Sequence, residues 1–458
     1  MKKLTIGVLS AGALAVAALS TSYFVGGKIQ QALEQTAESW STEDGFTVRV
    51  LEYQRGITGS HAKTLWSFAS EEDTYDITVT HDIVHGPWPL GHAAKVVSLF
   101  QLPDDSEPSL VEALQNRAPL EWTTTASWSG KTSHQLFSPN FATNFEDGSS
   151  LTWGGLKAEW TLSAERNAAK GFVRMPVLRV KVEEGNRMDV EDAEVTFDAR
   201  IPEGFNFWEG PSTFKIGLVS ALESESDTQF KLQQLHISST TTLQDKLVQM
   251  GLDTRIAKVE MPEYSVQNLA FDMRFNNIDA RWLDGLMLWM QRSPEAESTE
   301  NIPLPLPLPL RDLPELLAGK PEIAITRFGL ETPDGPAEMS ARVAYAGQQP
   351  EMFNPVSDLQ AQLNASLPKS VLIQLLDARV RSDYLALLEQ LGKELDEQEL
   401  QAAVDDGVSK RLKSLLSFGA IQDRGEKFTT ELEFEQGELK LNGQPAELQN
   451  LLRMGGAI

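Results

Sequence analysis

The feature that most constrains this chain is an uncharged run near its N-terminus. Lys2 and Lys3 precede Leu4–Gly27, which contains no charged residue. As a helix rising about 1.5 Å per residue the run would be roughly 36 Å long, enough to cross a hydrocarbon core of about 30 Å. From Lys28 onward the chain is long, acidic and soluble in composition. We therefore expect a single transmembrane anchor at residues 1–27.

The two lysines before the run favour a cytoplasmic N-terminus with the bulk of the chain on the other side of the membrane. A cleaved signal peptide is the alternative, because Ala18 and Ser20 have the small-residue spacing that a signal peptidase accepts. The apolar run continues through Tyr23, Phe24 and Val25, which favours a retained anchor. No cysteine is present, so a lipid-modified cysteine cannot be the anchor.

Composition excludes several classes of function. The 458 residues carry 40 basic and 65 acidic side chains, a net charge of −25. Phosphates and anionic headgroups repel such a chain, so we do not expect nucleic acid as a partner. Without cysteine the chain has no thiolate nucleophile or thiolate metal ligand, and it needs no oxidative folding.

The pattern after the anchor predicts a mainly β chain with helical insertions, an α+β class built on extended antiparallel sheets. Segments rich in β-branched and aromatic residues have period two and are separated by Gly, Asn and Asp clusters. Few of them alternate with helices, which argues against a doubly wound parallel sheet. The expected strands are residues 47–53, 75–84, 151–162, 172–182, 213–218, 231–241, 255–259, 269–275, 322–330, 337–345, 359–367 and 428–441.

Helical periodicity predicts helices at residues 28–40, 89–99, 280–291, 369–418 and 446–454. Within 369–418 the acidic segment Asp396–Gly407 is expected to turn between two helices. The leucines of that region, including Leu375 and Leu388, recur at i, i+3 and i+4 spacing, which predicts one buried apolar stripe.

Alternating proline and leucine at Ile302–Leu310 predict an extended segment, because each proline removes a backbone donor and keeps the preceding residue out of the α region. We interpret it as a stiff spacer within a linker and short helix at 301–320. This linker separates a β-rich region at 28–300 from a C-terminal β region at 321–458, which holds the helical insertion 369–418. An exposed apolar recognition strip is the alternative.

Three of the six histidines, His81, His85 and His92, lie close together in sequence. On a helix, the i, i+4 spacing of His81 and His85 would direct both at one metal ion. The period-two pattern around them predicts a strand, which separates them by about 13 Å on one face. Val79 and Ile83 share that face, so we interpret the pair as part of a packed surface and expect no metal site.

The Gly86-Pro87 pair is expected to form a turn that needs glycine with positive φ at Gly86. This turn could bring His92 near His85, which leaves a metal or acid–base site as an alternative. The chain has no nucleophile elbow, zinc-protease helix, phosphate-binding loop or dinucleotide fingerprint. We therefore expect neither a cofactor nor a catalytic residue.

Five tryptophans invite a sugar-binding or lipid-binding interpretation, because indole rings stack on sugars and line apolar grooves: Trp122, Trp128, Trp153, Trp160 and Trp208. We favour the simpler interpretation, that they form the hydrophobic core of a large sheet. Trp153 and Trp160 are seven residues apart and would face opposite ways in one continuous strand.

Several short motifs stand out: Gly26-Gly27; Tyr53-Gln54-Arg55-Gly56 followed by Ser60; Thr80-His81-Asp82-Ile83-Val84-His85-Gly86-Pro87; Pro321-Glu322-Ile323 leading to Thr332-Pro333-Asp334-Gly335; and the segment from Gly437 to Pro445. Together they resemble the YdgA/YihF family of Gram-negative envelope proteins, which has no assigned biochemical activity. The resemblance implies a periplasmic protein anchored in the inner membrane, and it is compatible with a homodimer. It supplies no catalytic residues. The segment from Thr80 to Pro87 is the most specific of these motifs. The motif residues that the resemblance singles out are Tyr53, Arg55, Gly56, His81, Asp82, His85, Gly86 and Pro87.

We therefore expect a non-enzymatic, membrane-anchored periplasmic protein that binds an apolar or lipid-like envelope component, or a protein partner. At the level of fold the long sheets are similar to anchored β-groove proteins of the AsmA type, which handle lipids. A groove of that kind would show as a continuous apolar face with helices at its ends. The alternatives are an envelope scaffold that self-associates and, less favoured, a hydrolase that uses His81, His85 or His92.

Overall fold

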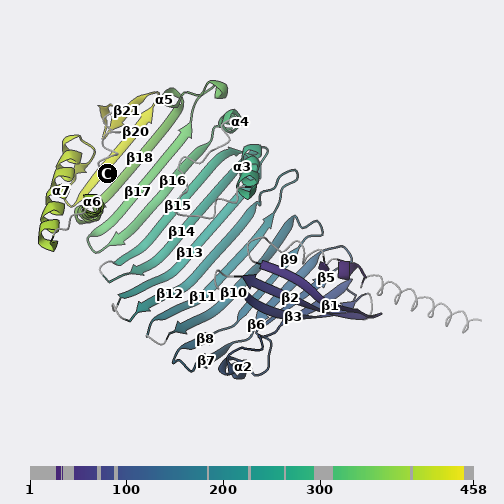
Figure 1. Ribbon diagram of the computed structural model, residues 1–458. Helices are drawn as coiled ribbons and strands as arrows, with labels where there is room; N and C mark the ends of the chain where they lie inside the picture. The colour runs from purple at the N-terminus through teal and green to yellow at the C-terminus, as the bar shows by residue number, and fades with distance from the viewer. Residues whose placement is uncertain are drawn as a thin grey trace, which may run out of the picture. The chain divides into compact units, whose positions relative to one another are not determined.

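The computed structural model describes residues 27–31, 33–34, 46–69, 74–86, 91–182, 185–224, 228–262, 265–292, 313–391 and 396–447. Within them the chain is mainly β, with antiparallel strand pairs and a few helices (Figure 1). It forms two compact units. Unit 1 comprises Met1–Arg200 and Ser212–Phe230, and unit 2 comprises Ile201–Pro211 and Lys231–Ile458. The Pro-Leu run that we expected to separate two regions lies outside the described residues.

Unit 1 is an antiparallel sheet in which most strands pair with their neighbours in sequence. Its elements are β1 (Phe46–Arg55), β2 (Gly59–Ala69), β3 (Thr74–His85), β4 (Ala94–Phe100), α2 (Pro108–Leu114), β5 (Leu120–Ala126), β6 (Thr132–Ser138), β7 (Phe141–Asn144), β8 (Ser150–Trp153), β9 (Leu156–Leu162), β10 (Ala168–Lys181), β11 (Arg187–Arg200) and β12 (Gly210–Glu223). The pairing order is β1-β2-β3-β4-β5-β6-β9-β10-β11-β12. The β7–β8 hairpin pairs with the second half of β10, beside β9.

Unit 2 is also an antiparallel sheet, with helices beyond its strand ends (Figure 1). Its elements are β13 (Thr228–Gln244, from Lys231 onward), β14 (Leu247–Glu260), β15 (Ser265–Asp279), α3 (Ala280–Arg292), α4 (Leu313–Ala318), β16 (Glu322–Thr332), β17 (Gly335–Tyr345), a 3-10 turn (Pro350–Met352), α5 (Pro355–Asp358), β18 (Leu359–Pro368), α6 (Lys369–Leu391), α7 (Glu397–Ser417), β19 (Gln422–Asp423), β20 (Lys427–Glu435), β21 (Glu438–Leu441) and β22 (Gln444–Ala446). Strands β13 to β18 pair in sequence order, followed by β20, β21 and β22.

Every segment expected to be a strand is confirmed, although two of them contain two strands each. Gly154-Gly155 separates β8 from β9, and a turn at Gln436-Gly437 separates β20 from β21. The longest strand that the pattern did not predict is β11. It was missed because charged residues occupy many of its alternate positions. Those charges are matched across the sheet, as in the Lys170–Asp198 and Arg174–Glu194 pairs.

The expected helix at residues 89–99 is wrong, because β4 occupies Ala94–Phe100. This strand hydrogen-bonds to β3 on one side and to β5 on the other. Pairing on both sides outweighs the weak local helical pattern. The expected helix at 280–291 is confirmed as α3.

The expected turn at Asp396–Gly407 is also wrong, because α7 begins at Glu397. Asp396 caps this helix, and its carboxylate accepts a hydrogen bond from the backbone amide of Glu399 at 2.8 Å. Acidic residues in the first turn favour a helix start by satisfying free amides and complementing the helix dipole.

Two other expected helices are described only in part. Residues 27–31, 33 and 34 are helical, and the rest of the segment 28–40 lies outside the described residues. Of the helix expected at 446–454, the structure describes Ala446, which ends β22, and Glu447.

Helices α6 and α7 form a hairpin with a hydrophobic core of its own. Its buried members are Leu376, Val380, Leu400, Val404, Val408 and Leu415. Leu388 packs against this core, as the leucine spacing predicted. Leu375, which we also placed in the buried stripe, is 58% exposed. The buried stripe therefore includes the adjacent Leu376 but not Leu375.

We predict that Leu376→Asp destabilises the protein by about 3 kcal/mol or more, because it buries an unpaired carboxylate. Leu375→Asp is the matched control on the same helical turn, and it should change the free energy of unfolding by less than about 0.5 kcal/mol. Chemical denaturation of the purified chain measures both values. Equal effects of the two substitutions would contradict the orientation of α6.

Gly86 is required for a reason other than the positive φ that we expected, because its φ lies outside that region. Its amide donates a hydrogen bond to the Ala93 carbonyl at 2.8 Å, which closes the turn after β3. A Cβ atom at Gly86 would lie 1.5 Å from the carbonyl oxygen of His92. Close approach of two backbones, and not a left-handed conformation, therefore demands glycine.

We predict that Gly86→Val lowers the free energy of unfolding by about 3 kcal/mol, because the turn must open to admit a side chain. Gly285→Ala is the control: it lies in α3, where an added Cβ meets nothing within 4 Å. Alanine should leave stability unchanged or raise it by up to about 1 kcal/mol. Thermal melting compares them, and an unaltered melt of Gly86→Val would refute the turn geometry.

Candidate functional site

The sheet of unit 2 has one face that is almost entirely apolar. Alternate residues of a strand point to the same face, so the register identifies side-chain rows that cross the sheet. One row consists of Met250, Phe275, Ile323, Val343, Ala361, Phe434 and Leu439. The next consists of Leu252, Met273, Ile325, Ala341, Leu363, Leu432 and Leu441. We call this surface the apolar face of unit 2.

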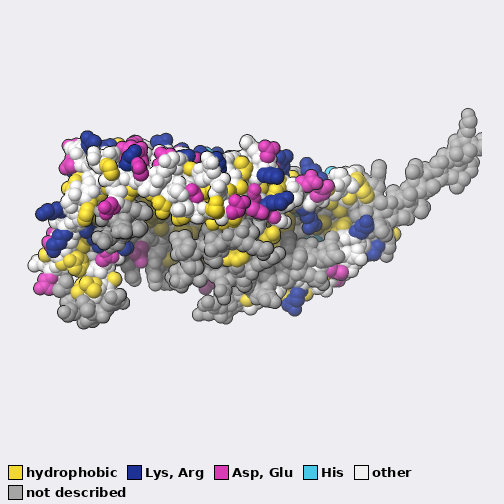
Figure 2. All heavy atoms as spheres, turned by 90° about the horizontal axis from the view of Figure 1, so that it is seen from above, with side chains coloured by type: hydrophobic (Ala, Val, Ile, Leu, Met, Phe, Trp, Pro, Cys, Tyr) yellow, Lys and Arg dark blue, Asp and Glu magenta, His cyan; other side chains and the backbone are white. Residues whose placement is uncertain are grey.

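The opposite face of the same strands is polar and carries ordered ion pairs. Its row between the two apolar rows is Gly251, Arg274, Ala324, Arg342, Gln362, Glu433 and Lys440. Arg274 Nη2 lies 2.6 Å from Asp253 Oδ1, and Arg342 Nη2 lies 2.6 Å from Glu322 Oε2. In Figure 2, charged side chains lie mainly along the upper edge of the view, and hydrophobic side chains lie beneath them. The polar face is thus adapted to water.

Among the residues that the structure describes, helices lie at the two ends of the apolar face of unit 2. At the end where β15 finishes, α3 and α4 pack on it, in a cluster with Phe207, Val248, Ile278 and Leu283 buried. The α6–α7 hairpin follows the opposite end, after β18. Between them no side chain of the two rows on β15 to β18 is fully buried, and Ile323 and Val343 are 47% and 46% exposed. A sheet face with this composition is normally buried by a second layer.

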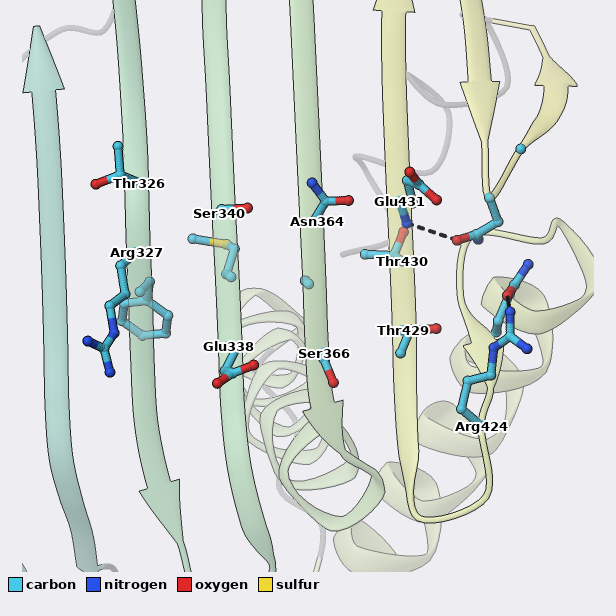
Figure 3. A pocket seen from close by; sticks show the side chains of 16 residues that line it. Thr326, Arg327, Glu338, Ser340, Asn364, Ser366, Arg424, Thr429, Thr430 and Glu431 are labelled. Carbon is cyan, nitrogen blue, oxygen red and sulfur yellow. Dashed lines mark hydrogen bonds between the residues drawn. The ribbon is translucent and has the colours of Figure 1, made fainter.

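A pocket of about 550 Å³ lies on β16, β17, β18 and β20, and most of its lining side chains are polar (Figure 3). Ser340, Asn364 and Glu431 form one polar row across it. Arg327 and Arg424 lie at opposite sides of the view. The pocket offers hydrogen-bond donors and acceptors to a polar ligand.

Unit 1 also has a largely apolar face, but polar side chains interrupt it. One row is Tyr53, Ala62, His81, Ser98, Trp122, Leu136, Ala158, Val173, Val195 and Phe214. A second is Ser60, Ile83, Val96, Thr124, His134, Trp160, Gly171, Phe197 and Ser212. We call this surface the apolar face of unit 1.

His81 is buried in the apolar face of unit 1 and bridges three strands. Its Nε2 is 2.9 Å from Thr64 Oγ1 on β2, and its Nδ1 is 2.7 Å from Ser98 Oγ on β4. Trp66 Nε1 donates to the same Thr64 oxygen at 3.0 Å. Burial lowers the pKa of His81 to about 4. His81 is therefore neutral near pH 7.

His85 shares this face, as the strand pattern predicted, and is fully buried. Its Nε2 is 3.0 Å from Ser60 Oγ. Burial lowers the pKa of His85, and a backbone hydrogen bond with Ile57 partly opposes that shift. Ser60 is 1% exposed, so the serine and the imidazole are close but closed to solvent.

Asp82 and His92 do not join the buried histidines. Asp82 lies on the opposite face, where its Oδ1 is 2.7 Å from His61 Nδ1. The side chain of His92 is exposed in the turn before β4. Within the part of the chain that the structure describes, no group of three or more His, Asp and Glu side chains is placed to hold a metal ion.

His134 was not singled out from the sequence, yet it is the centre of a half-buried aromatic cluster. Its ring stacks on Trp160 at 4.9 Å between centroids and 11° between planes, and Trp122 lies 6.0 Å from both rings. Of the tryptophans considered above, Trp153 donates instead to Ser138 Oγ at 2.8 Å, while Trp128 and Trp208 are exposed. Only the register of β5, β6 and β9 brings His134 to the two indoles.

The motif residues near the N-terminus gather where β1, β2 and β3 meet. Gly56 donates its amide to the Gly59 carbonyl at 2.9 Å, and a Cβ atom at Gly56 would lie 2.4 Å from that oxygen. A Cβ atom at Gly27 would lie 3.0 Å from Arg55 Nη1, so the N-terminal helical residues pass directly beside this guanidinium. Tyr53 pairs with Ala62 in the row described above. Pro87 lies outside the described residues.

A family model described as a bacterial protein of unknown function (DUF945) matches residues 1–449. The chain belongs to the DUF945 family. No curated protein and no solved structure matches it. The family description assigns no activity, so the function must be argued from the two sheets.

The expected membrane anchor falls almost wholly on residues before Gly27, which the structure does not describe. Among the described residues, no helix is both long enough and apolar enough to cross a bilayer.

We predict that His81 makes the protein less stable in acid. Its pKa is about 4 when folded and about 6.5 when unfolded, so between these values the unfolded chain binds more protons. Stability should therefore fall as the pH drops from about 6.5 toward 4, by roughly 2–3 kcal/mol at pH 4.5. His81→Gln, whose amide can still bond both hydroxyls, should lose that part of the dependence.

Denaturant titrations at pH 7 and 4.5 measure this difference. His61→Gln is the control, because it removes an exposed imidazole from the opposite face. The prediction fails if His81→Gln and the parent lose equal stability between the two pH values.

Proposed function

We propose that this protein is a non-enzymatic, membrane-anchored component of the cell envelope that binds a lipid-like molecule on the apolar faces of its sheets. The observation that carries this proposal is the apolar face of unit 2. Two adjacent rows contain no polar side chain across seven strands, yet Ile323 and Val343 remain about half exposed. Leaving such a surface in water is unfavourable, so a bound apolar molecule would stabilise it.

The chemistry of the face favours hydrocarbon over a protein surface. Seven strands cover six spacings of about 4.8 Å, so each row extends roughly 29 Å. A protein interface of that size normally includes polar groups at its rim and about one hydrogen bond per 100–200 Å². The two rows provide no side-chain donor or acceptor, whereas an acyl chain requires none.

The proposed location rests on the N-terminus and on the family resemblance. The uncharged run at residues 4–27 follows two lysines, which supports a single inner-membrane span with the bulk of the chain in the periplasm. The likeness to YdgA/YihF envelope proteins supports the same location. The described helical residues begin at Gly27, where that run ends.

Self-association as an envelope scaffold is the second candidate. A specific observation favours it: α6 exposes four large apolar side chains, Ile373, Leu375, Leu385 and Leu387, at 40–58%. A homodimer could bury them. A hydrolase is less favoured, because Ser60 and His85 lie 3.0 Å apart but are closed to a substrate.

We predict that Ile323→Gln combined with Val343→Gln weakens binding of a fluorescent fatty-acid probe roughly tenfold, because both side chains lose apolar contact with the ligand. These positions face each other across β16 and β17 and are already exposed, so stability should change by less than about 1 kcal/mol. Probe titration of the purified full chain, freed of detergent by an amphipathic polymer, measures the affinity.

Ser340→Gln combined with Asn364→Gln is the matched control, because these neighbours lie on the opposite face of the same sheet. It should leave probe binding unchanged. A parent chain that binds no probe, or a control that weakens binding as much as the apolar-face variant, would refute the proposal. Light scattering of the same samples tests the scaffold alternative.

A further inference from the structure

Two threonines hold His134 on the apolar face of unit 1. Its Nδ1 is 3.0 Å from Thr124 Oγ1, the residue opposite it on β5, and its Nε2 is 2.9 Å from Thr132 Oγ1, two residues earlier on β6. Burial lowers the pKa of His134, which keeps the imidazole neutral near pH 7. We call these residues the Thr-His-Thr triad.

The hydrogen bonds within the triad use only one of its two threonine O–H donors. A neutral imidazole has one N–H and one bare nitrogen. One threonine must donate its O–H to the bare nitrogen, and the other accepts the N–H and keeps its own O–H. Within the described part of the chain neither hydroxyl has another hydrogen-bond partner. One hydroxyl hydrogen therefore remains unused in a largely apolar surface.

The triad is accessible, in contrast to the similar His81 arrangement. Thr64, His81 and Ser98 are buried, whereas Thr124, His134 and Thr132 are partly exposed.

The surroundings of the triad are aromatic. Trp160 stacks on His134 and lies over Gly171, where a Cβ atom would come within 2.5 Å of the tryptophan Cβ. Trp122, whose ring lies 6.0 Å from that of Trp160, is the third aromatic side chain of this cluster. The rows that contain the triad carry no charged side chain.

We propose that the Thr-His-Thr triad donates its spare hydroxyl hydrogen to the carbonyl oxygen of an acyl ester, whose hydrocarbon chain lies on the apolar face of unit 1. This inference rests on the proposed function and narrows the ligand from any apolar molecule to an uncharged acyl ester. A free carboxylate fits less well, because the triad and its two tryptophans offer no positive charge and only partial contact with water. A plain hydrocarbon would leave the hydroxyl unpaired.

The test compares three probes with equal chains: methyl dodecanoate, dodecane and dodecanoate. Each displaces a fluorescent apolar reporter from the purified full chain, freed of detergent by an amphipathic polymer. The parent should bind the ester more tightly than the alkane by roughly 2- to 10-fold, the factor expected of one neutral hydrogen bond. It should also prefer the ester to the carboxylate.

The triple variant Thr124→Val, His134→Phe, Thr132→Val replaces the whole triad by apolar groups of similar shape, which need not destabilise the fold. It should bind ester and alkane equally, with alkane affinity unchanged. Thr123→Val with Thr125→Val, on the opposite face of β5, is the control and should keep the ester preference. Thr132→Val alone provides a smaller change if the triple variant does not fold.

Each outcome decides a different point. A parent that binds ester and alkane equally overturns the triad proposal and leaves apolar binding intact. A triple variant that keeps the ester preference overturns it as well. A parent that binds none of the three probes refutes the proposed function itself.

Discussion

The alternation of side chains along a pleated strand is the constraint on which the rest of this molecule depends. Because successive residues point to opposite faces, each strand supplies both an apolar and a polar surface. The hydrogen-bond register then aligns those residues into rows across the sheet. A slip of one residue would exchange the faces. Asn277 has a positive φ inside β15 and lies where the register shifts opposite Val248 and Met250. Asparagine adopts this left-handed conformation more readily than most residues, so the sheet can contain a bulge at this position.

The polar interruptions of the apolar face in unit 1 are possible because hydroxyl groups on neighbouring strands satisfy them. A buried polar group costs free energy unless it is hydrogen-bonded, and a buried charge costs far more. His81 and His134 meet both conditions by remaining neutral and bonding two hydroxyls each. The apolar face of unit 2 has no comparable imidazole in its rows. The two faces therefore differ in chemistry although both follow from the same alternation.

The local sequence pattern was sufficient to predict a strand whose own residues alternate between apolar and polar. The strand containing His81 and His85 was predicted because Val79 and Ile83 alternate with polar residues, and the structure places all four on one face. Pattern failed where the deciding interaction lies in another segment. Strand β11 is stabilised by charged side chains that pair with those of β10. Strand β4 is stabilised by hydrogen bonds with β3 and β5. The cluster around His134 depends on the register of three strands, which no local window contains.

Sequential pairing of strands has a consequence for size. Because most strands bond only to the strands before and after them in the chain, each sheet behaves as a linear array in which neighbours interact and distant strands do not. Such an array can gain or lose one hairpin without changing the pairs elsewhere, since two strands restore the original chain direction. Each hairpin would lengthen the apolar rows by about 9.6 Å. The length of the apolar surface could therefore change in steps of one hairpin during evolution, without a change in the chemistry of its side chains.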